Sequence, residues 1–244
     1  TYEIAMVMIR RLFPDLADRI TYLRDLNTEQ LGVGEDTLYR ILAALPERIN
    51  RKALQEMLSD HQDELDKIFR THDAPPDGYR VRSVCLYGMA ECERSRIYCD
   101  FLRQGDMETV GALMYLSHDG DRVVTYDGGN TPLPRYNRVT DAYLQRLIDG
   151  TVNGATGSHL WQQPGGYDCS CEELDHLVDI ARTVPGVVGA NLTGAGLGGC
   201  VLVVVREAAV KTFLKMVHEE YYEFRGLEPS TIVCTSVDHA GKIF

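Results

Sequence analysis

A glycine-rich segment in the last third of the chain constrains its fold more than any other feature of the sequence. Four glycines fall within six residues of Thr193–Cys200, and the apolar run Val201–Val205 follows directly. The glycine spacing fits a dinucleotide-binding G-x-G-x-x-G loop, but that loop needs a helix directly after it. The β-type run that follows excludes this function. A P-loop is also excluded, because Cys200 and Val201 stand where Lys and Ser or Thr would meet phosphate and Mg²⁺.

Two interpretations of this segment remain open. In the first, it is a hairpin connection whose glycines supply positive φ angles and let two backbones approach. In the second, its bare backbone amides approach an anion or another loop. We predict that Val187–Leu192 and Cys200–Val205 pair as strands across the turn.

Hydrophobic periodicity divides the rest of the chain. Residues 1–118 carry apolar stripes at helical spacing, and residues 166–244 alternate between helical and β-type patterns. Residues 119–165 are rich in Gly and Pro, and we expect them to form an insertion with one helix over Val139–Ile148. The fold class is therefore expected to be α+β, with helices on one face of an antiparallel sheet.

Local signals predict several boundaries. One helix should end at Gly105, and Asp106 should cap the next. Ser170 and Glu173 have the spacing of a capping box. The β-branched run Thr231–Val237 predicts a final strand.

Composition excludes some classes of function. The formal net charge of −11 argues against nucleic-acid binding as a main role, since that depends on Lys and Arg neutralising phosphates. The aliphatic run Val201–Val205 is far shorter than the roughly 20 residues of a membrane span. No secretory signal is visible, so we expect a cytoplasmic protein. Because the chain starts at Thr1 rather than Met, we expect that something upstream has been removed, either a tag or half of a protein.

Two isolated polar groups have simple interpretations. His118 lies near an expected helix end and is predicted to interact with exposed carbonyl groups there. Asp119, Gly120 and Asp121 could contribute to a cation site, but the other ligands of a calcium loop are missing. We therefore expect a solvated turn.

Several motifs resemble the galactokinase branch of the GHMP kinases. Residues 185–200, PGVVGANLTGAGLGGC, are similar to the third conserved motif of that family, and Tyr167–Asp175 resembles its D-Y-E-V-S-C-P-E-L-D element. Gly105-Asp106 and the stretch Leu113–His118 resemble another conserved segment. The sequence departs from the family at Asn191, where a basic residue is usual, and in the intervening 119–166 segment.

The resemblance implies a two-lobed enzyme that transfers the γ-phosphoryl group of ATP to a sugar hydroxyl, with Mg²⁺, at C1 for galactokinases. The sugar signature, the Ser-rich phosphate loop and the catalytic Asp belong to the family's N-terminal lobe and are not found here. The chain therefore resembles the C-terminal lobe, with a ferredoxin-like α/β sandwich and an antiparallel sheet. Its expected partner is the N-terminal lobe, and the chain alone is expected to be inactive.

The resemblance also assigns roles to particular residues. Tyr2 matches a tyrosine that touches the sugar. The glycine loop would support the phosphate loop of the other lobe through Thr193, Gly194, Ala195, Gly196, Leu197, Gly198 and Gly199. No catalytic residue and no metal ligand is expected in this chain. The alternatives are a non-catalytic relative that senses sugar or binds a partner, and a free-standing α+β binding module.

Overall fold

The computed structural model describes residues 1–126, 131–194 and 196–235. In chain order it contains α1 (Tyr2–Leu12), α2 (Pro14–Ala17), η1 (Leu23–Asp25), α3 (Thr28–Leu31), α4 (Glu35–Ala43), α5 (Arg51–Met57), η2 (Ser59–His61), α6 (Gln62–Phe69), α7 (Val81–Gln104) and α8 (Met107–Asp121). It continues with β1 (Val124–Tyr126), β2 (Pro132–Pro134), α9 (Asp141–Val152), η3 (Leu160–Gln162), α10 (Glu172–Thr183), β3 (Val187–Thr193), β4 (Cys200–Val205), η4 (Glu207–Ala209), α11 (Val210–Val217) and the π-helical η5 (His218–Glu223).

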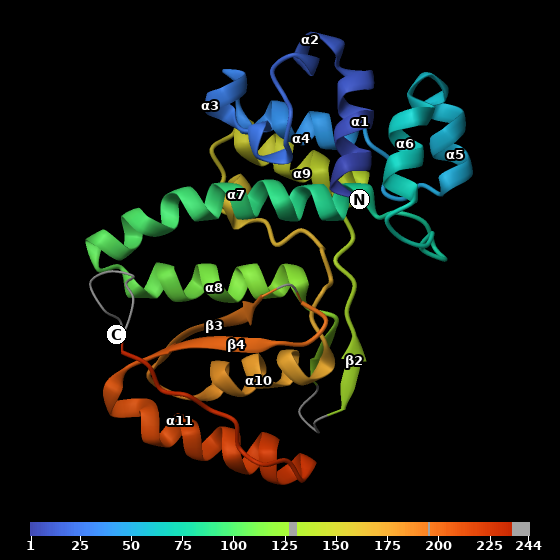
Figure 1. Ribbon diagram of the computed structural model, residues 1–244. Coiled ribbons are helices and arrows are strands. Elements are labelled where there is room, and N and C mark those ends of the chain that lie inside the picture. The colour runs from blue at the N-terminus through green and yellow to red at the C-terminus, as the bar shows by residue number, and fades with distance from the viewer. Residues whose placement is uncertain (127–130, 195, 236–244) are drawn as a thin grey trace, which may run out of the picture.

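The molecule is an α+β protein built in layers, which confirms the expected fold class. The helices α1–α6 and α9 lie on one side of the long helix α7, and α8 follows on the other side of α7 (Figure 1). The β3–β4 sheet comes next, and α10 and α11 lie beyond it (Figure 1). We call α1–α7 with α9 the helical part, and α8, β3, β4, α10 and α11 the sheet part.

The helical part is held by one large apolar core. It includes the predicted stripe on α4, where Leu38 and Leu42 are fully buried. Helix α7 ends as predicted at Gly105, which adopts the left-handed conformation at φ 72°. The Asp106 carboxylate accepts a hydrogen bond from the backbone N–H of Thr109 and so caps α8.

The two central strands pair as predicted. β3 and β4 are antiparallel, with Leu192 opposite Val201 and Thr193 opposite Cys200, and the glycine-rich segment joins them. α10 packs against this sheet on one face, and α8 covers β3 on the other, so the expectation of helices on one face only is wrong. Helix α8 can lie this close because Gly111 faces Val188 and Gly189: a Cβ at Gly111 would overlap the Val188 carbonyl group.

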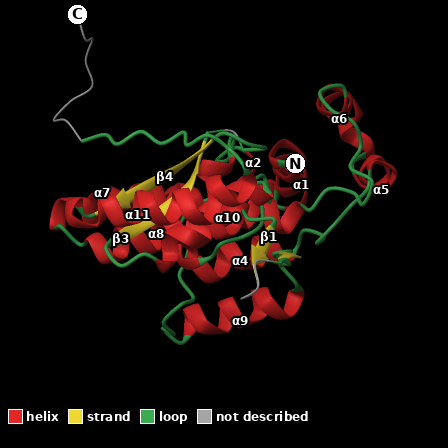
Figure 2. Ribbon diagram, turned by 90° about the horizontal axis from the view of Figure 1, so that it is seen from below, coloured by secondary structure: helices red, strands yellow, loops and turns green. Residues whose placement is uncertain are grey.

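Residues 119–165 contain the predicted helix, which forms as α9 over Asp141–Val152. Its apolar face packs against α4, and Leu144, Leu147 and Ile148 belong to the core of the helical part. Figure 2 shows α9 beside the main body, whereas the α5–α6 pair stands apart. The segment therefore contributes to the same core as the N-terminal helices.

Two local expectations are wrong. The described part of the predicted Thr231–Val237 strand, residues 231–235, forms no strand. Ile232 is 89% exposed and pairs with no sheet edge, so β-branched composition alone did not make a strand; residues 236 and 237 lie outside the described residues. Ser170 does not cap α10 either, because its buried side chain turns inward and Cys171 is the N-cap residue.

Candidate functional site

Three tyrosines stack where the start of the chain meets α7. Tyr167 lies between the other two rings: its centroid is 5.6 Å from that of Tyr2 and 5.3 Å from that of Tyr87. The planes are nearly parallel, at 8° and 14°. Gly88 makes room for this arrangement, because a Cβ there would meet the Tyr2 ring. Burial raises the pKa of Tyr2, so its phenol is neutral at physiological pH.

The Asp121 side chain connects this stack to the segment before α10. Its carboxylate accepts one hydrogen bond from the Tyr87 hydroxyl at 2.7 Å and one from the Cys169 thiol at 3.0 Å. Burial raises the pKa of Asp121, and the two hydrogen bonds oppose that rise. Burial and the neighbouring carboxylate raise the pKa of Cys169 to about 12. Cys169 is therefore a thiol that donates a hydrogen bond and not a nucleophilic thiolate.

Cys169 in turn contacts the glycine loop. Its carbonyl oxygen accepts a hydrogen bond from the backbone N–H of Leu197. Gly196 lies against the same residue at φ 83°, and a Cβ there would come within 2.5 Å of the Cys169 carbonyl oxygen and sulfur. Only glycine fits this position, since it supplies both the positive φ and the close approach.

The rest of the loop projects outward. Leu197 has a φ of 58° and its side chain is 87% exposed. Gly194 and Gly198 also have positive φ angles, and a Cβ at either position would meet no other described residue within 4 Å. Thr193 and Gly199 lie at the strand ends, and Ala195 lies outside the described residues. The loop is thus a hairpin connection whose outer face carries the exposed Leu197 side chain beside bare glycine backbone.

The structure therefore brings together two predicted site elements that are far apart in the sequence. Tyr2 and Gly196 are joined by a continuous chain of contacts through Tyr167, Tyr87, Asp121 and Cys169. We call these residues the tyrosine–Asp121 relay. Its hydroxyl and thiol groups with raised pKa stay protonated, so the relay is suited to positioning groups and not to nucleophilic attack.

The prediction for His118 is wrong. The side chain is fully buried at the C-terminal end of α8, and its Nδ1 accepts a hydrogen bond from the Leu192 N–H at 3.2 Å. Its Nε2 lies 3.2 Å from Asp175 Oδ1 on α10. Burial would raise the pKa of Asp175, but His118, Ser170 and two backbone amides lower it below its ordinary value. His118 thus ties α8, β3 and α10 together.

The solvated turn expected at Asp119–Asp121 is also wrong. These residues form the last turn of α8, where Gly120 and Asp121 are buried. Asp119 instead pairs with arginines, at 2.8 Å from Arg182. Within the ranges that the structure describes, no group of three or more His, Cys, Asp or Glu side chains is arranged to hold a metal ion.

The sequence analysis missed Tyr87, Asp121 and Cys169 as parts of the site. Each stands in an ordinary helical or loop context, and they meet only through tertiary packing. No signal in the sequence marks Tyr87, because Gly120 and Gly165 approach it only in the folded chain, where a Cβ at either position would overlap Tyr87 atoms.

Comparison with known proteins agrees with the resemblance noted in the sequence. Residues 144–223 match the family described as GHMP kinases C terminal. The chain is 29% identical to a galactokinase of Fusobacterium nucleatum over 157 residues, which is 64% of the chain and 30% of that protein. It is 35% identical to a galactokinase of Thermosipho africanus over 157 residues, 58% of the chain and 44% of that protein. A galactokinase of Clostridium beijerinckii is 42% identical over 77 residues, 32% of the chain and 20% of that protein.

The chain spans less than half the length of these relatives. The matched family region runs from α9 through the glycine loop to η5 and so contains most of the sheet part. None of the helices in the described ranges is long and apolar enough to cross a membrane.

Proposed function

We propose that the complete protein is an ATP-dependent sugar kinase. The chain carries a GHMP kinase C-terminal domain at residues 144–223 and is related to galactokinases. The complete protein transfers the γ-phosphoryl group to a sugar hydroxyl, the C1 hydroxyl of galactose or a related sugar. This chain supplies one lobe, and its partner is the remaining N-terminal lobe.

The tyrosine–Asp121 relay carries this proposal. Phosphoryl transfer depends on holding the phosphates and the attacking hydroxyl in one geometry. Tyr2, the candidate sugar contact, and Gly196, in the candidate phosphate-loop support, are positioned by one rigid series of stacked rings and short hydrogen bonds. Such a series of contacts would hold Tyr2 and Gly196 in one fixed position relative to each other.

ATP and Mg²⁺ are the proposed cofactors. The face of the glycine loop at Gly194 and Gly198, where a Cβ would contact none of the other described residues, suits close approach of another loop or of a phosphate. We assign the metal-ligating carboxylates to the rest of the protein, as the resemblance to the family implies. Mg²⁺ bound with the nucleotide would neutralise phosphate charge during transfer. Catalytic groups are accordingly assigned to the rest of the protein.

The setting we propose is the cytoplasm. All seven cysteines are free, including the exposed Cys99, Cys200 and Cys234. Free exposed thiols persist in a reducing compartment and are unusual outside it.

The test is ATP-dependent phosphorylation by the full-length protein with galactose and its epimers. We expect one of these sugars to be phosphorylated, and Tyr2→Ala to lower kcat/KM for it by about tenfold, or roughly 1.4 kcal/mol. Tyr22→Ala is a matched control, because Tyr22 is exposed on the same part of the chain and lies outside the relay.

Two outcomes would redirect the proposal. Sugar binding without phosphorylation would identify the non-catalytic sensor that we consider the alternative function. Phosphorylation by the 244-residue chain alone would refute the assignment of catalysis to the other lobe.

A further inference from the structure

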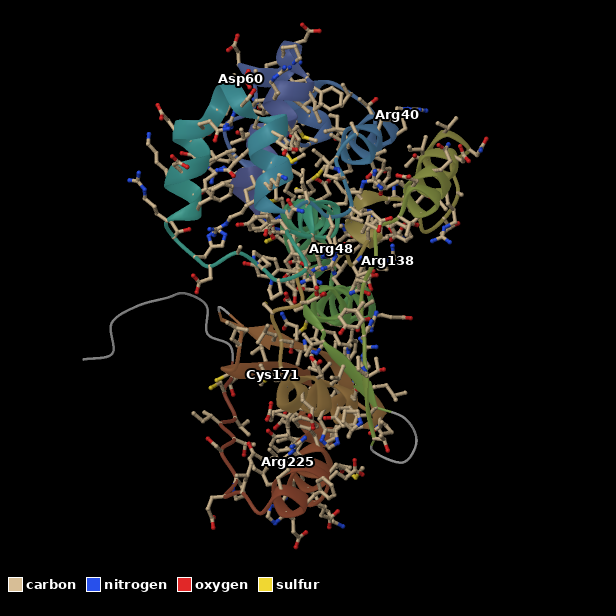
Figure 3. The ribbon with its side chains drawn as sticks, turned by 90° about the vertical axis from the view of Figure 1, so that its right-hand side faces the viewer. Arg40, Arg48, Asp60, Arg138, Cys171 and Arg225 are labelled. Atoms are coloured by element: carbon tan, nitrogen blue, oxygen red, sulfur yellow. The ribbon has the colours of Figure 1, made fainter. Side chains whose placement is uncertain are left out.

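A second candidate site lies away from the tyrosine–Asp121 relay, at a cavity of about 390 Å³. Its wall is formed by the segment after α4, the beginning of α7 and residues 136–138. Three of the residues that line it are arginines, Arg48, Arg80 and Arg138, and Glu47 is the one acidic residue among the described lining. Figure 3 shows Arg48 and Arg138 where the helices at the top of the view meet the lower part of the molecule.

The described lining thus holds three basic side chains and one acidic side chain, although the chain as a whole has a net charge of −11. Guanidinium groups present paired N–H donors that match the oxygens of phosphate and carboxylate. A volume of this size lies at the lower end of the range for small-molecule sites. We propose that this arginine pocket binds a small polyanion that carries two or more phosphate or carboxylate groups.

The arginines at the rim are free to exchange partners. Arg138 pairs with Glu47 at 2.8 Å, but its side chain is 72% exposed. Arg48 lies 3.6 Å from an Asp77 carboxylate that is itself 86% exposed. Exposed pairs of this kind contribute about 0–1 kcal/mol, so a multivalent anion can displace them.

Arg80 forms the inner wall of the pocket. It is more buried than the other two, and burial together with the nearby Arg48 lowers its pKa. An anion between Arg80 and Arg48 would interact with both guanidinium groups. The uncharged residues Ser83 and Asn137 form another part of the pocket wall, and hydrogen bonds hold them in place. The Ser83 hydroxyl donates to the Asn137 carbonyl, and the Asn137 side-chain amide donates to the Asp119 carbonyl.

Arg80 also connects the pocket to the relay. It forms an ion pair with Asp168 and donates to the Tyr167 carbonyl oxygen at 3.3 Å. Asp168 stands between Tyr167 and Cys169, at a strained φ of 53°, and its buried Oδ1 has no hydrogen-bond partner among the residues that the structure describes. A polyanion that attracts Arg80 would compete with Asp168 for this guanidinium group. It would thereby change the conformation of the segment that carries the relay residues Tyr167 and Cys169. This coupling rests on the proposed function, whereas anion binding does not.

Calorimetric titration of the full-length protein with pyrophosphate tests the binding, with saturating ADP present to occupy a nucleotide site. We expect saturable binding that weakens as salt rises, and at least a tenfold loss of affinity in the Arg48→Gln/Arg138→Gln double variant. Both side chains are largely exposed, so the variant should melt within about 2 °C of the parent. Arg40→Gln is the matched control, because Arg40 is an exposed arginine on α4 outside the pocket, and it should bind pyrophosphate as the parent does.

The absence of saturable binding, or equal affinity in the parent and the double variant, overturns the proposal. Citrate and orthophosphate distinguish the source of the anion: tighter binding of citrate identifies a polycarboxylate, and weak binding of orthophosphate confirms the need for more than one anionic group. If the full-length protein has kinase activity, pyrophosphate should change the KM for sugar in the parent and not in the double variant. If it has none, the binding measurements alone decide.

Discussion

The helical part and the sheet part are stabilised in different ways. Among the described residues, thirty buried apolar side chains form one cluster in the helical part, whereas the clusters in the sheet part and the adjoining η5 contain four and three. The sheet part relies instead on close backbone contact, as between Gly111 and Val188, and on buried polar ties such as His118 with Asp175. The glycine loop belongs to this less apolar part.

The difference suggests that the helical part provides stability and that the sheet part positions the glycine loop. A large, closely packed apolar core allows few alternative side-chain arrangements, so it stabilises the helical part. Polar ties and glycine contacts depend on geometry, so they position a loop accurately without adding much apolar burial. The relay crosses from one part to the other, because Tyr2 and Tyr87 belong to the helical part and Cys169 lies beside the sheet part.

Truncation of the large core should have the largest effect. Leu42→Ala removes a fully buried side chain on α4, and we expect a loss of about 3 kcal/mol in the free energy of unfolding. Urea denaturation measures it, and Leu102→Ala on the exposed surface of α7 is the control, with a loss of less than about 0.5 kcal/mol. Equal effects of the two changes would contradict the role of the large apolar core in the stability of the helical part.

The glycine loop should show the next largest effect, on activity. Gly196→Val and Gly198→Val both place a branched residue at positive φ, but only the first clashes with Cys169. We expect Gly196→Val to lower kcat of the full-length protein by about a hundredfold, or roughly 2.7 kcal/mol, and Gly198→Val to lower it less. Melting temperatures of both variants, measured alongside kcat, separate a role of the loop in positioning from a role in stability. If both variants lose stability yet keep a normal kcat, the loop is only a scaffold.

Removal of a polar tie should have a smaller effect. His118→Ala deprives the Leu192 N–H of its acceptor and leaves the Asp175 carboxylate buried without its imidazole. We expect a loss of about 2 kcal/mol in stability. His159→Ala removes an exposed His–Glu35 pair and serves as the control, with a change of less than about 0.5 kcal/mol. Amide exchange should then quicken in β3 and α10 before it changes in α4, and the reverse order would contradict the assignment.

The smallest effect should appear in the pH dependence. The pKa of Asp175 is lowered in the folded protein, so its contribution to stability is present above the unfolded pKa and is lost as the pH falls through the folded pKa. We expect Asp175→Asn to make the acid limb of the stability curve shallower. Asp121→Asn should do the opposite, because the raised pKa of Asp121 favours the folded state at low pH. Urea midpoints measured from about pH 3 to pH 7 test both signs.

Several elements of the fold were predictable from neighbouring residues alone. The end of α7 at Gly105, the Asp106 cap, helix α9 and the β3–β4 pairing across the glycine loop all follow from local rules. Backbone conformation and amphipathic periodicity act over a few residues, and so a short window of sequence records them. The same window misjudged residues 231–235, because a strand also needs an edge to pair with.

The sequence by itself determined the α+β class, the hairpin with its glycine loop and the resemblance to galactokinases. Only the tertiary structure decided that Tyr2, Tyr87, Asp121 and Cys169 form one relay, that His118 is a buried tie, and that Arg48, Arg80 and Arg138 share a cavity. The physical reason is that a side chain's charge, burial and hydrogen-bond partners are set by groups remote in the sequence. Those groups come together only when the helical part and the sheet part pack against each other.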